Sequence, residues 1–502
     1  MLFNSFPFIA IFLPLAWSAW HLAVRLDRLQ LGKAALILAS LVFYAAWDIR
    51  FLPVLLGSVI VNYAIGRRIL AAPDGEETGR RWLIGGIAFN LSVLGFFKYA
   101  GFLLSNLGAL FGISLPFHSL PLPLAISFVT FQKIAFLVDC RRGLIKRSEP
   151  LDYLFFVSFF PQLIAGPIVH YRPFTCQADP DANRLLKSWP AQATGLFLFA
   201  AGLFKKVVLA DNLARYVAPV FALARHGLPG QGSAWQGMLA FTLQLYFDFS
   251  GYSDMALGLG LMFGIRLPFN FDSPYRSASL IEFWRRWHMT LSAFLRDYLY
   301  IPLGGNRHGA ISRYRNMLIT MLLGGLWHGA GWTFLLWGGL HGLLLAVNHL
   351  WRSLVASQAW LAGLWARVPK IVPRGLTFLS VALAWVLFRA EDAASAGRIL
   401  CALLHPDHGP GVPLPSWDSP SALVESFLAT RPEAAWLWIG LGLTLVWTLP
   451  NPARWIGYDD TPNGPWRARP GILAGLAAGG MAWFALKWMA TQAPTEFLYF
   501  VF

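Results

Sequence analysis

One histidine, His328, stands in the glycine- and tryptophan-rich stretch 324–333, between the apolar runs 317–323 and 334–347. An imidazole is costly to bury in such a segment, so it needs a hydrogen-bonding partner, a water-filled cavity or a chemical use. Imidazole titrates near neutral pH, and burial favours its neutral, basic form. A neutral His328 could take the proton of an alcohol while that alcohol attacks an activated acyl group. We predict that His328 is the reactive centre.

A second histidine, His288, lies in the arginine- and aromatic-rich stretch 281–292. This stretch predicts a helix that lies at the membrane interface or dips into the protein interior. His288 could orient the donor carbonyl or stabilise the oxyanion formed by the attack. The alternative is an interfacial histidine whose polar atoms are satisfied by the backbone.

A third histidine, His341, follows His328 by thirteen residues. In one regular helix it would point about 220° away and lie about 20 Å further along, so the two rings could not share a ligand. We therefore expect a structural role for His341.

No metal site is expected. The carboxylate and histidine ligands of a di-iron hydroxylase, at i, i+3 or i+4 spacing, are missing from the sequence. The three cysteines, Cys140, Cys176 and Cys401, form no CxxC pair. The HxxH string His405-Pro-Asp-His408 lies in a proline- and glycine-rich stretch, which favours a loop over a zinc site.

Membrane helices are expected to position these histidines. Of the 502 residues 56% are hydrophobic and 13% charged, and several apolar runs reach the roughly 20 residues that cross about 30 Å of hydrocarbon. The net charge of +15 resides in short loops beside apolar segments, as the positive-inside rule predicts, and does not require nucleic acid. The sequence predicts an all-α polytopic membrane protein with about ten to twelve crossings and an outward-facing N-terminus.

We expect one integral membrane domain over 1–502, with N-terminal helices in 1–150, a catalytic core in 151–350 and C-terminal helices in 351–502. The segment 153–170 contains two prolines and a glycine, which favour a broken or re-entrant segment over a straight helix. We expect 82–111 to form one long or two short membrane segments, interrupted by Lys98, and 352–374 to form a loop. The other predicted spans are 6–24, 33–47, 51–65, 121–138, 191–208, 235–265, 376–387, 434–449 and 472–489.

Polar side chains inside the apolar segments indicate an internal wall. Gln244 and Asp248 are four residues apart and share one helix face, so we expect them, with Asp254 and Trp327, to line a channel rather than to face lipid. Lys205 and Lys206 lie near the end of the run 191–208. They are either snorkelling lysines or a phosphate contact near the inner face.

Several strings carry a family resemblance. They are Phe160-Pro-Gln-Leu-Ile-Ala-Gly-Pro167, Gly202-Leu-Phe-Lys-Lys206, Gln244-Leu-Tyr-Phe-Asp-Phe-Ser-Gly-Tyr-Ser-Asp254, Phe283-Trp-Arg-Arg-Trp-His-Met-Thr-Leu-Ser292, Arg296-Asp-Tyr-Leu-Tyr-Ile-Pro-Leu-Gly-Gly-Asn-Arg307, Leu326-Trp-His-Gly-Ala-Gly331 and Phe497-Leu-Tyr-Phe500. Together they cover nearly the whole chain. They resemble the membrane-bound O-acyltransferase family, and within it the bacterial branch that O-acetylates exopolysaccharides such as alginate.

This resemblance implies a helical funnel with re-entrant or interfacial helices, in which His328 is the catalytic histidine and His288 the second active-site position. An acyl-CoA would enter from the cytosol and the acceptor from the other face. Basic residues at the inner mouth would suit the phosphates of CoA. The candidates are Lys205, Lys206, Arg285 and Arg286.

The resemblance also implies acetyl-CoA as donor substrate, no permanently bound cofactor, and a place in the bacterial inner membrane. The acetyl group would pass to a periplasmic partner of the SGNH-hydrolase-like type that works with the polysaccharide secretion machinery. Three alternatives stay open: a family member serving peptidoglycan, cellulose or teichoic acid, a polysaccharide exporter without chemistry, and a structural scaffold. The last leaves the buried histidine and acidic groups unexplained.

Overall fold

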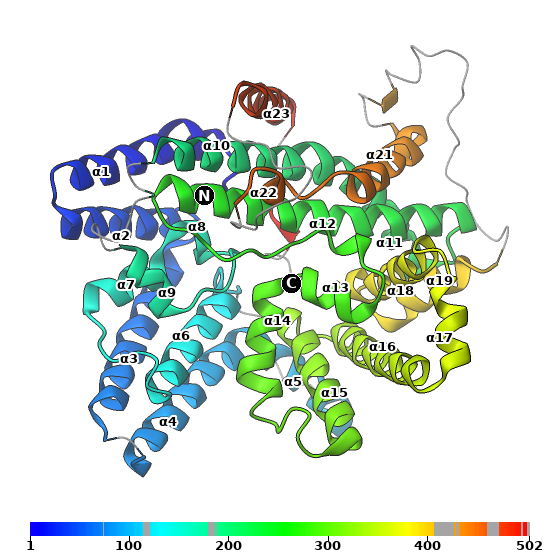
Figure 1. Cartoon of the computed structure of the whole chain (residues 1–502), viewed down its shortest axis with the longest axis horizontal. Coiled ribbons are helices and arrows are strands. Elements are labelled where there is room, and N and C mark those ends of the chain that lie inside the picture. The colour runs from blue at the N-terminus through cyan, green and yellow to red at the C-terminus, as the bar shows by residue number, and fades with distance from the viewer. Residues whose placement is uncertain are drawn as a thin grey trace. The chain divides into compact units, whose positions relative to one another are not determined.

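The computed structural model describes residues 1–73, 75–113, 121–178, 185, 188–405, 426–427, 431–458, 471–492 and 495–498. These residues form helices and no strand, and the chain divides into two compact units (Figure 1). The first comprises Met1–Leu203, Tyr252–Phe269 and Ala468–Val501, and the second Phe204–Gly251, Asn270–Arg467 and Phe502. The prediction of one domain over the whole chain stays a prediction.

The first unit is built from antiparallel apolar helices, among which α1 packs on α2, and α3, α4 and α6 pack on one another (Figure 1). The helices of this unit are α1 (Leu13–Arg25), α2 (Leu29–Ala45), α3 (Leu52–Ala71), α4 (Glu77–Leu94), α5 (Ala100–Phe111), α6 (Ile126–Arg141), α7 (Pro150–Ser158), α8 (Phe160–Leu163), α9 (Tyr171–Thr175), α10 (Trp189–Phe204), the end of α12 (Gln231–Met262) and α23 (Ile472–Thr491).

Two interruptions were expected in this unit. The segment 153–170 is broken as predicted, because α7 ends at Ser158 and only the short, buried α8 follows before the chain becomes irregular. At Lys98 the helix does not break: α4 continues into α5 through one π-helical turn, Gly95–Tyr99, in which one extra residue is accommodated without ending the helix.

The second unit carries the predicted histidines. Its helices are α11 (Asp211–His226), residues 231–251 of α12, α13 (Leu280–Arg286), α14 (Met289–Leu295), α15 (Gly309–His328), α16 (Trp332–Ser357), α17 (Ala359–Ala366), α18 (Ile371–Arg389), α19 (Ala393–Ala402), α21 (Ala435–Thr448) and α22 (Pro452–Trp455). The helix predicted over 191–208 continues beyond residue 208, because a π-helical segment, Lys205–Ala210, leads directly into α11. The predicted loop over 352–374 is mostly helical, in α16, α17 and α18.

Helices α15 and α16 form a closely packed antiparallel hairpin (Figure 1). A Cβ atom at Gly338 would lie 2.3 Å from the carbonyl oxygen of Met321, and one at Gly325 would lie 2.2 Å from that of Phe334. Glycine is therefore required at both positions, because the opposing backbone occupies the space of a side chain. The hairpin turns between His328 and Trp332.

Seven helical stretches of the described residues are long and apolar enough to cross a membrane. Many of their apolar side chains are exposed, for example Ile472 at 84% and Leu473 at 81%, as expected of a surface that faces lipid. The class of all-α polytopic membrane protein is thus confirmed. The central funnel and the ten to twelve crossings stay predictions.

Candidate active site

His328 is the last residue of α15 and is buried, with 5% of its surface exposed. Its ring lies among three aromatic side chains: the centroid distances are 4.8 Å to Trp327, 5.2 Å to Trp337 and 5.2 Å to Phe388. The chain leaves the helix at Gly329 in an extended conformation, and a Cβ atom there would lie 2.1 Å from the ring of Phe334. The glycine therefore lets the aromatic wall close around the imidazole.

His288 lies at the break between α13 and α14 and is completely buried. Its backbone has φ 43° and ψ 55°, the left-handed region that residues other than glycine, asparagine and aspartate rarely adopt. This strained conformation turns the ring inward, where Nδ1 lies 3.1 Å from Oδ1 of Asn270.

The hydrogen bonds of Asn270 indicate which nitrogen of His288 carries the proton. The same Oδ1 accepts hydrogen bonds from the backbone N–H of Thr290 at 3.3 Å and from its hydroxyl at 3.1 Å, so this atom is the amide oxygen. His288 must then donate from Nδ1, which leaves Nε2 with its lone pair. Burial lowers the pKa of His288 to about 3, so the ring is neutral.

This tautomer changes the role expected for His288. A neutral ring with its proton on Nδ1 can accept a hydrogen bond at Nε2 but cannot donate one to an oxyanion. The predicted oxyanion role therefore does not suit His288. The ring suits an acceptor for the hydroxyl of a substrate.

Trp327 connects the two histidines. Its ring centroid lies 4.8 Å from that of His328 and 6.2 Å from that of His288, and Phe249 of α12 packs edge-on against His288 at 4.7 Å. The second unit thus brings together His328, His288 and Trp327, three of the residues that the sequence singled out.

His341 lies closer to His328 than one regular helix would allow. Because the chain turns between α15 and α16, both rings contact the indole of Trp337, with centroid distances of 5.2 Å from His328 and 4.9 Å from His341. The expectation of one continuous helix was wrong at Gly329–Gly331, where the backbone is extended.

The hydrogen bond that His341 accepts leaves its other ring nitrogen, Nε2, as a donor. Its Nδ1 accepts the indole N–H of Trp284 at 3.3 Å, so the neutral ring carries its proton on Nε2. That atom is buried and has no hydrogen-bonding partner among the described residues, and the same holds for the indole nitrogens of Trp337 and Trp385, which pack on His341 and on each other. Each such donor costs about 1–3 kcal/mol when it stays unsatisfied, so an oxygen acceptor near this cluster would be favoured.

The predicted polar wall of α12 is buried, with Gln244 at 8% and Asp248 at 1% exposed. Oε1 of Gln244 is buried without a hydrogen bond to any described residue. Asp248 instead pairs with Lys206, whose Nζ lies 2.7 Å from Asp248 and 2.8 Å from Asp211. Asp254, in the first unit, is 2% exposed, and its place in a channel stays a prediction.

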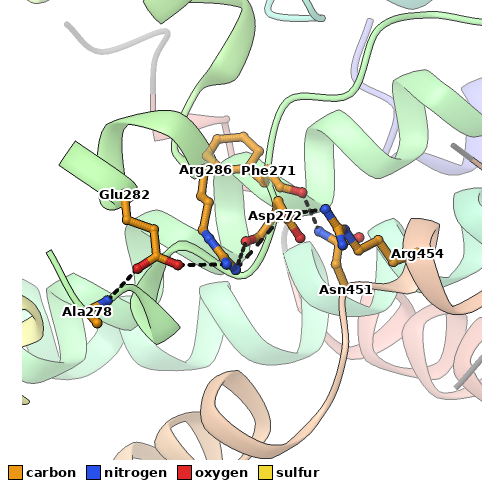
Figure 2. Close-up of polar contacts among 7 residues, drawn as sticks. All are labelled: Phe271, Asp272, Ala278, Glu282, Arg286, Asn451 and Arg454. Carbon is orange, nitrogen blue, oxygen red and sulfur yellow. Dashed lines mark hydrogen bonds and ion pairs between the residues drawn. The ribbon is translucent and has the colours of Figure 1, made fainter. Parts of the chain in front are cut away.

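Of the four predicted phosphate contacts, three have partners within the protein and the fourth, Arg285, lines a cavity. Lys206 is enclosed by two carboxylates, with 4% of its side chain exposed, and is neither a snorkelling lysine nor an exposed cation. Lys205, also buried, lies 3.4 Å from the hydroxyl of Ser250 and 5.8 Å from the ring centroid of Tyr246. Arg286 pairs with Glu282 at 2.7 Å and approaches Asp272 (Figure 2).

Arg285 is different, because it lines a cavity of about 770 Å³ that the sequence did not indicate. Arg313 and His349 line the same cavity, and neither Arg285 nor Arg313 forms an ion pair with a carboxylate of the described residues. Apolar residues such as Met317 and Leu345 form much of the remaining wall. A cavity with this lining suits an amphiphile that carries a negatively charged group.

Sequence reasoning missed Asn270, Arg313 and His349. Asn270 stands between two phenylalanines just before the 281–292 stretch, and a lone amide in that setting was the available signal. No group of three or more histidine, cysteine or acidic side chains is placed to hold a metal ion within the part of the chain that the structure describes. Residues 406–408 of the HxxH string lie outside that part.

Residues 124–383 match the membrane-bound O-acyltransferase family. The chain is also 43% identical over 427 residues to a peptidoglycan O-acetyltransferase of Helicobacter pylori, an alignment that covers 80% of this chain and 79% of that protein. The chain therefore belongs to this family and is a membrane-bound acyltransferase.

Relatives with different named acceptors occur within the family. A probable alginate O-acetylase of Azotobacter vinelandii is 45% identical over 410 residues, covering 80% of this chain and 78% of that protein. A teichoic acid D-alanyltransferase of Streptococcus thermophilus is 31% identical over 293 residues, covering 53% of this chain and 68% of that protein. The likeness to the polysaccharide O-acetylating branch thus extends further along the chain.

Proposed function

We propose that this protein moves an acetyl group from cytosolic acetyl-CoA across the bacterial inner membrane for O-acetylation of a secreted polysaccharide such as alginate. The observation that carries the proposal is that the rings of His328 and His288 both lie against one indole, that of Trp327. Two buried imidazoles suit proton transfer from a hydroxyl group.

In the proposed step, the oxygen of an acceptor hydroxyl attacks the carbonyl carbon of the acetyl thioester. His328 takes the hydroxyl proton as the C–O bond forms, and it returns the proton to the sulfur as the C–S bond breaks. Nε2 of His288 accepts a hydrogen bond that orients the hydroxyl. The N–H groups of His341 and Trp337 are the donors available to the developing oxyanion.

The donor would bind in the cavity beside Arg285 and Arg313, where guanidinium groups without carboxylate partners attract phosphates. Arg313 precedes His328 by fifteen residues of α15, about 22 Å at 1.5 Å per residue. The phosphates and the acyl group of the donor would therefore lie toward opposite ends of this helix, which suits a thioester on a long arm. The basic end would face the cytosol by the positive-inside rule.

A periplasmic partner of the SGNH-hydrolase-like type would then pass the acetyl group to the polymer. The names of the relatives favour a cell-envelope polymer as final acceptor, alginate or peptidoglycan ahead of teichoic acid, because the longer alignments are to the first two. An exporter without chemistry would need neither the paired imidazoles nor the arginine-lined cavity.

Charge removal in the cavity tests the donor assignment. Arg285→Gln and Arg313→Gln should each raise the KM for acetyl-CoA at least about fivefold, with a smaller effect on kcat, since each removes a contact to the donor away from the reacting atoms. The control is Arg225→Gln, which removes an equally charged side chain that pairs with Glu391 on the surface. Unchanged KM in both cavity variants would refute this donor site.

A further inference from the structure

The short segment 270–272 carries Asn270, the hydrogen-bonding partner of His288, and is attached to the chain on both sides of that histidine. The backbone N–H of Asp272 donates to the carbonyl oxygen of Arg286 at 3.0 Å, and the backbone N–H of Met289 donates to that of Asn270 at 2.9 Å. These two bonds bracket His288. Any displacement of 270–272 would therefore move the acceptor of the imidazole.

A second set of contacts holds this segment from α22 and the residue before it (Figure 2). The amide Nδ2 of Asn451 donates to the carbonyl oxygen of Phe271 at 2.7 Å, and Nη2 of Arg454 lies 2.6 Å from Oδ2 of Asp272. Arg286 approaches the same carboxylate oxygen at 4.0 Å. The carboxylate of Asp272 thus lies between a guanidinium from beside His288 and one from α22.

We call the contacts of Asn451 with Phe271 and of Arg454 with Asp272 the clamp; Asn451 is buried, and the side chain of Arg454 is half exposed. Asn451 is 2% exposed, and while Nδ2 binds Phe271, Oδ1 accepts the backbone N–H of Ala453 at 2.9 Å and so caps α22. The side chain of Asn451 therefore caps the start of α22 and at the same time holds the segment 270–272. Charge-assisted bonds such as that of Arg454 to Asp272 are stronger and more directional than neutral ones.

We propose that Asn451 and Arg454 are positioning residues for His288, which hold the segment 270–272 so that Asn270 keeps the imidazole in its Nδ1–H form. This inference rests on the proposed function of His288. Both residues lie beyond 124–383, the part of the chain that matches the family. Their contacts are with Phe271 and Asp272, so their effect would pass through these residues and Asn270.

Two variants each remove one contact of the clamp. Asn451→Asp keeps an oxygen that can cap α22 but places a second acceptor against the carbonyl of Phe271. Arg454→Met keeps the length of the stem and removes the ion pair, while Arg454→Lys keeps the charge. Arg225→Met is the matched control, because its side chain is 48% exposed, as against 49% for Arg454, and also pairs with a carboxylate.

We expect Asn451→Asp and Arg454→Met to lower kcat for acetyl transfer at least about tenfold, with KM for acetyl-CoA nearly unchanged. The melting temperature in detergent should stay nearly unchanged in Arg454→Met and fall in Asn451→Asp, which buries a carboxylate at a position that is 2% exposed. Arg454→Lys should recover much of the loss, and Arg225→Met should behave as wild type. A role in folding alone would lower the melting temperature and the amount of active protein without changing kcat per folded molecule. Wild-type kcat in both clamp variants would overturn the proposal.

A readout independent of activity separates this inference from the proposed function. In protein labelled with ¹⁵N-histidine, the nitrogen shifts of His288, assigned with a His288→Gln variant, report the tautomer directly. We expect the Nδ1–H form in wild type and a mixture of forms in Asn451→Asp. An unaltered tautomer would refute the clamp, even if acetyl transfer were confirmed. A wild-type protein without transferase activity would refute the proposed function and leave the tautomer result standing.

Discussion

Asn270 accepts a hydrogen bond from Nδ1 of His288 at 3.1 Å, and this contact leaves Nε2 of the imidazole as the basic atom. Because the backbone N–H of Thr290 donates to the same amide oxygen, the orientation of the Asn270 amide is set by the main chain. The chemistry available at His288 therefore depends on a residue that does not titrate.

Replacing Asn270 by aspartate should change the pH dependence of the reaction. The wild-type pKa of His288, lowered to about 3 by burial, keeps the ring neutral throughout the range in which activity is measured. A carboxylate beside Nδ1 would favour the protonated ring and raise this pKa. Activity of Asn270→Asp should fall as the pH drops through the raised pKa, about tenfold per unit below it. A pH–rate profile of kcat parallel to that of wild type would contradict this account of His288.

Lys206 should matter for folding rather than for donor affinity. Its ammonium group lies between the buried carboxylates of Asp211 and Asp248. Lys206→Met would remove the ammonium partner that both carboxylates share in a buried environment, at a cost of about 3–5 kcal/mol. We expect a large fall in the melting temperature in detergent and no change in KM for acetyl-CoA in the protein that stays folded. A stable variant with a raised KM would instead support the phosphate contact that the sequence suggested.

Two adjacent glycines of α16 test the α15–α16 hairpin. Gly338→Ala would bring Cβ to 2.3 Å from the carbonyl oxygen of Met321, so the helices must separate, and we expect destabilisation of about 1–3 kcal/mol or more together with loss of activity. At Gly339 the nearest neighbour is a methyl carbon of Leu322 at 3.4 Å. Gly339→Ala should therefore be neutral or slightly stabilising. Equal melting temperatures for the two variants would contradict the hairpin geometry.

His341 should contribute through a hydrogen bond rather than through its volume. His341→Phe keeps an aromatic ring but removes both nitrogens, whereas His341→Gln keeps an amide that can donate. If the N–H of His341 meets the oxyanion, kcat should fall about a hundredfold in the phenylalanine variant and considerably less in the glutamine variant. Equal kcat values, with only the melting temperature reduced, would return His341 to a structural role.

The sequence led to His328, His288, Trp327 and the broken segment after Ser158 because each carries a local signal: a polar ring in an apolar run, or prolines and a glycine where a helix would be expected. The all-α membrane class followed from hydrophobic runs for the same reason. These features depend on neighbours along the chain.

Features that depend on distant residues were not predictable. Asp248, which neutralises Lys206, lies 42 residues further along and meets it only when α12 packs beside the Lys205–Ala210 segment. His341 was placed out of reach of His328 because the turn at 329–331 could not be distinguished from helix. Asn270 was not predicted because an amide does not titrate, and its effect on the tautomer of His288 depends on a contact that only the fold creates.

The central claim is that His328 is the general base of acyl transfer, and its most direct test is the kcat for transfer from radiolabelled acetyl-CoA by the purified protein with its periplasmic partner present. His328→Ala should reduce this rate by about 10²–10⁴-fold with folding and donor binding intact. His226→Ala, which alters an exposed histidine at the end of α11, should have no effect. Equal rates in wild type and His328→Ala would contradict the account and favour an exporter or a scaffold.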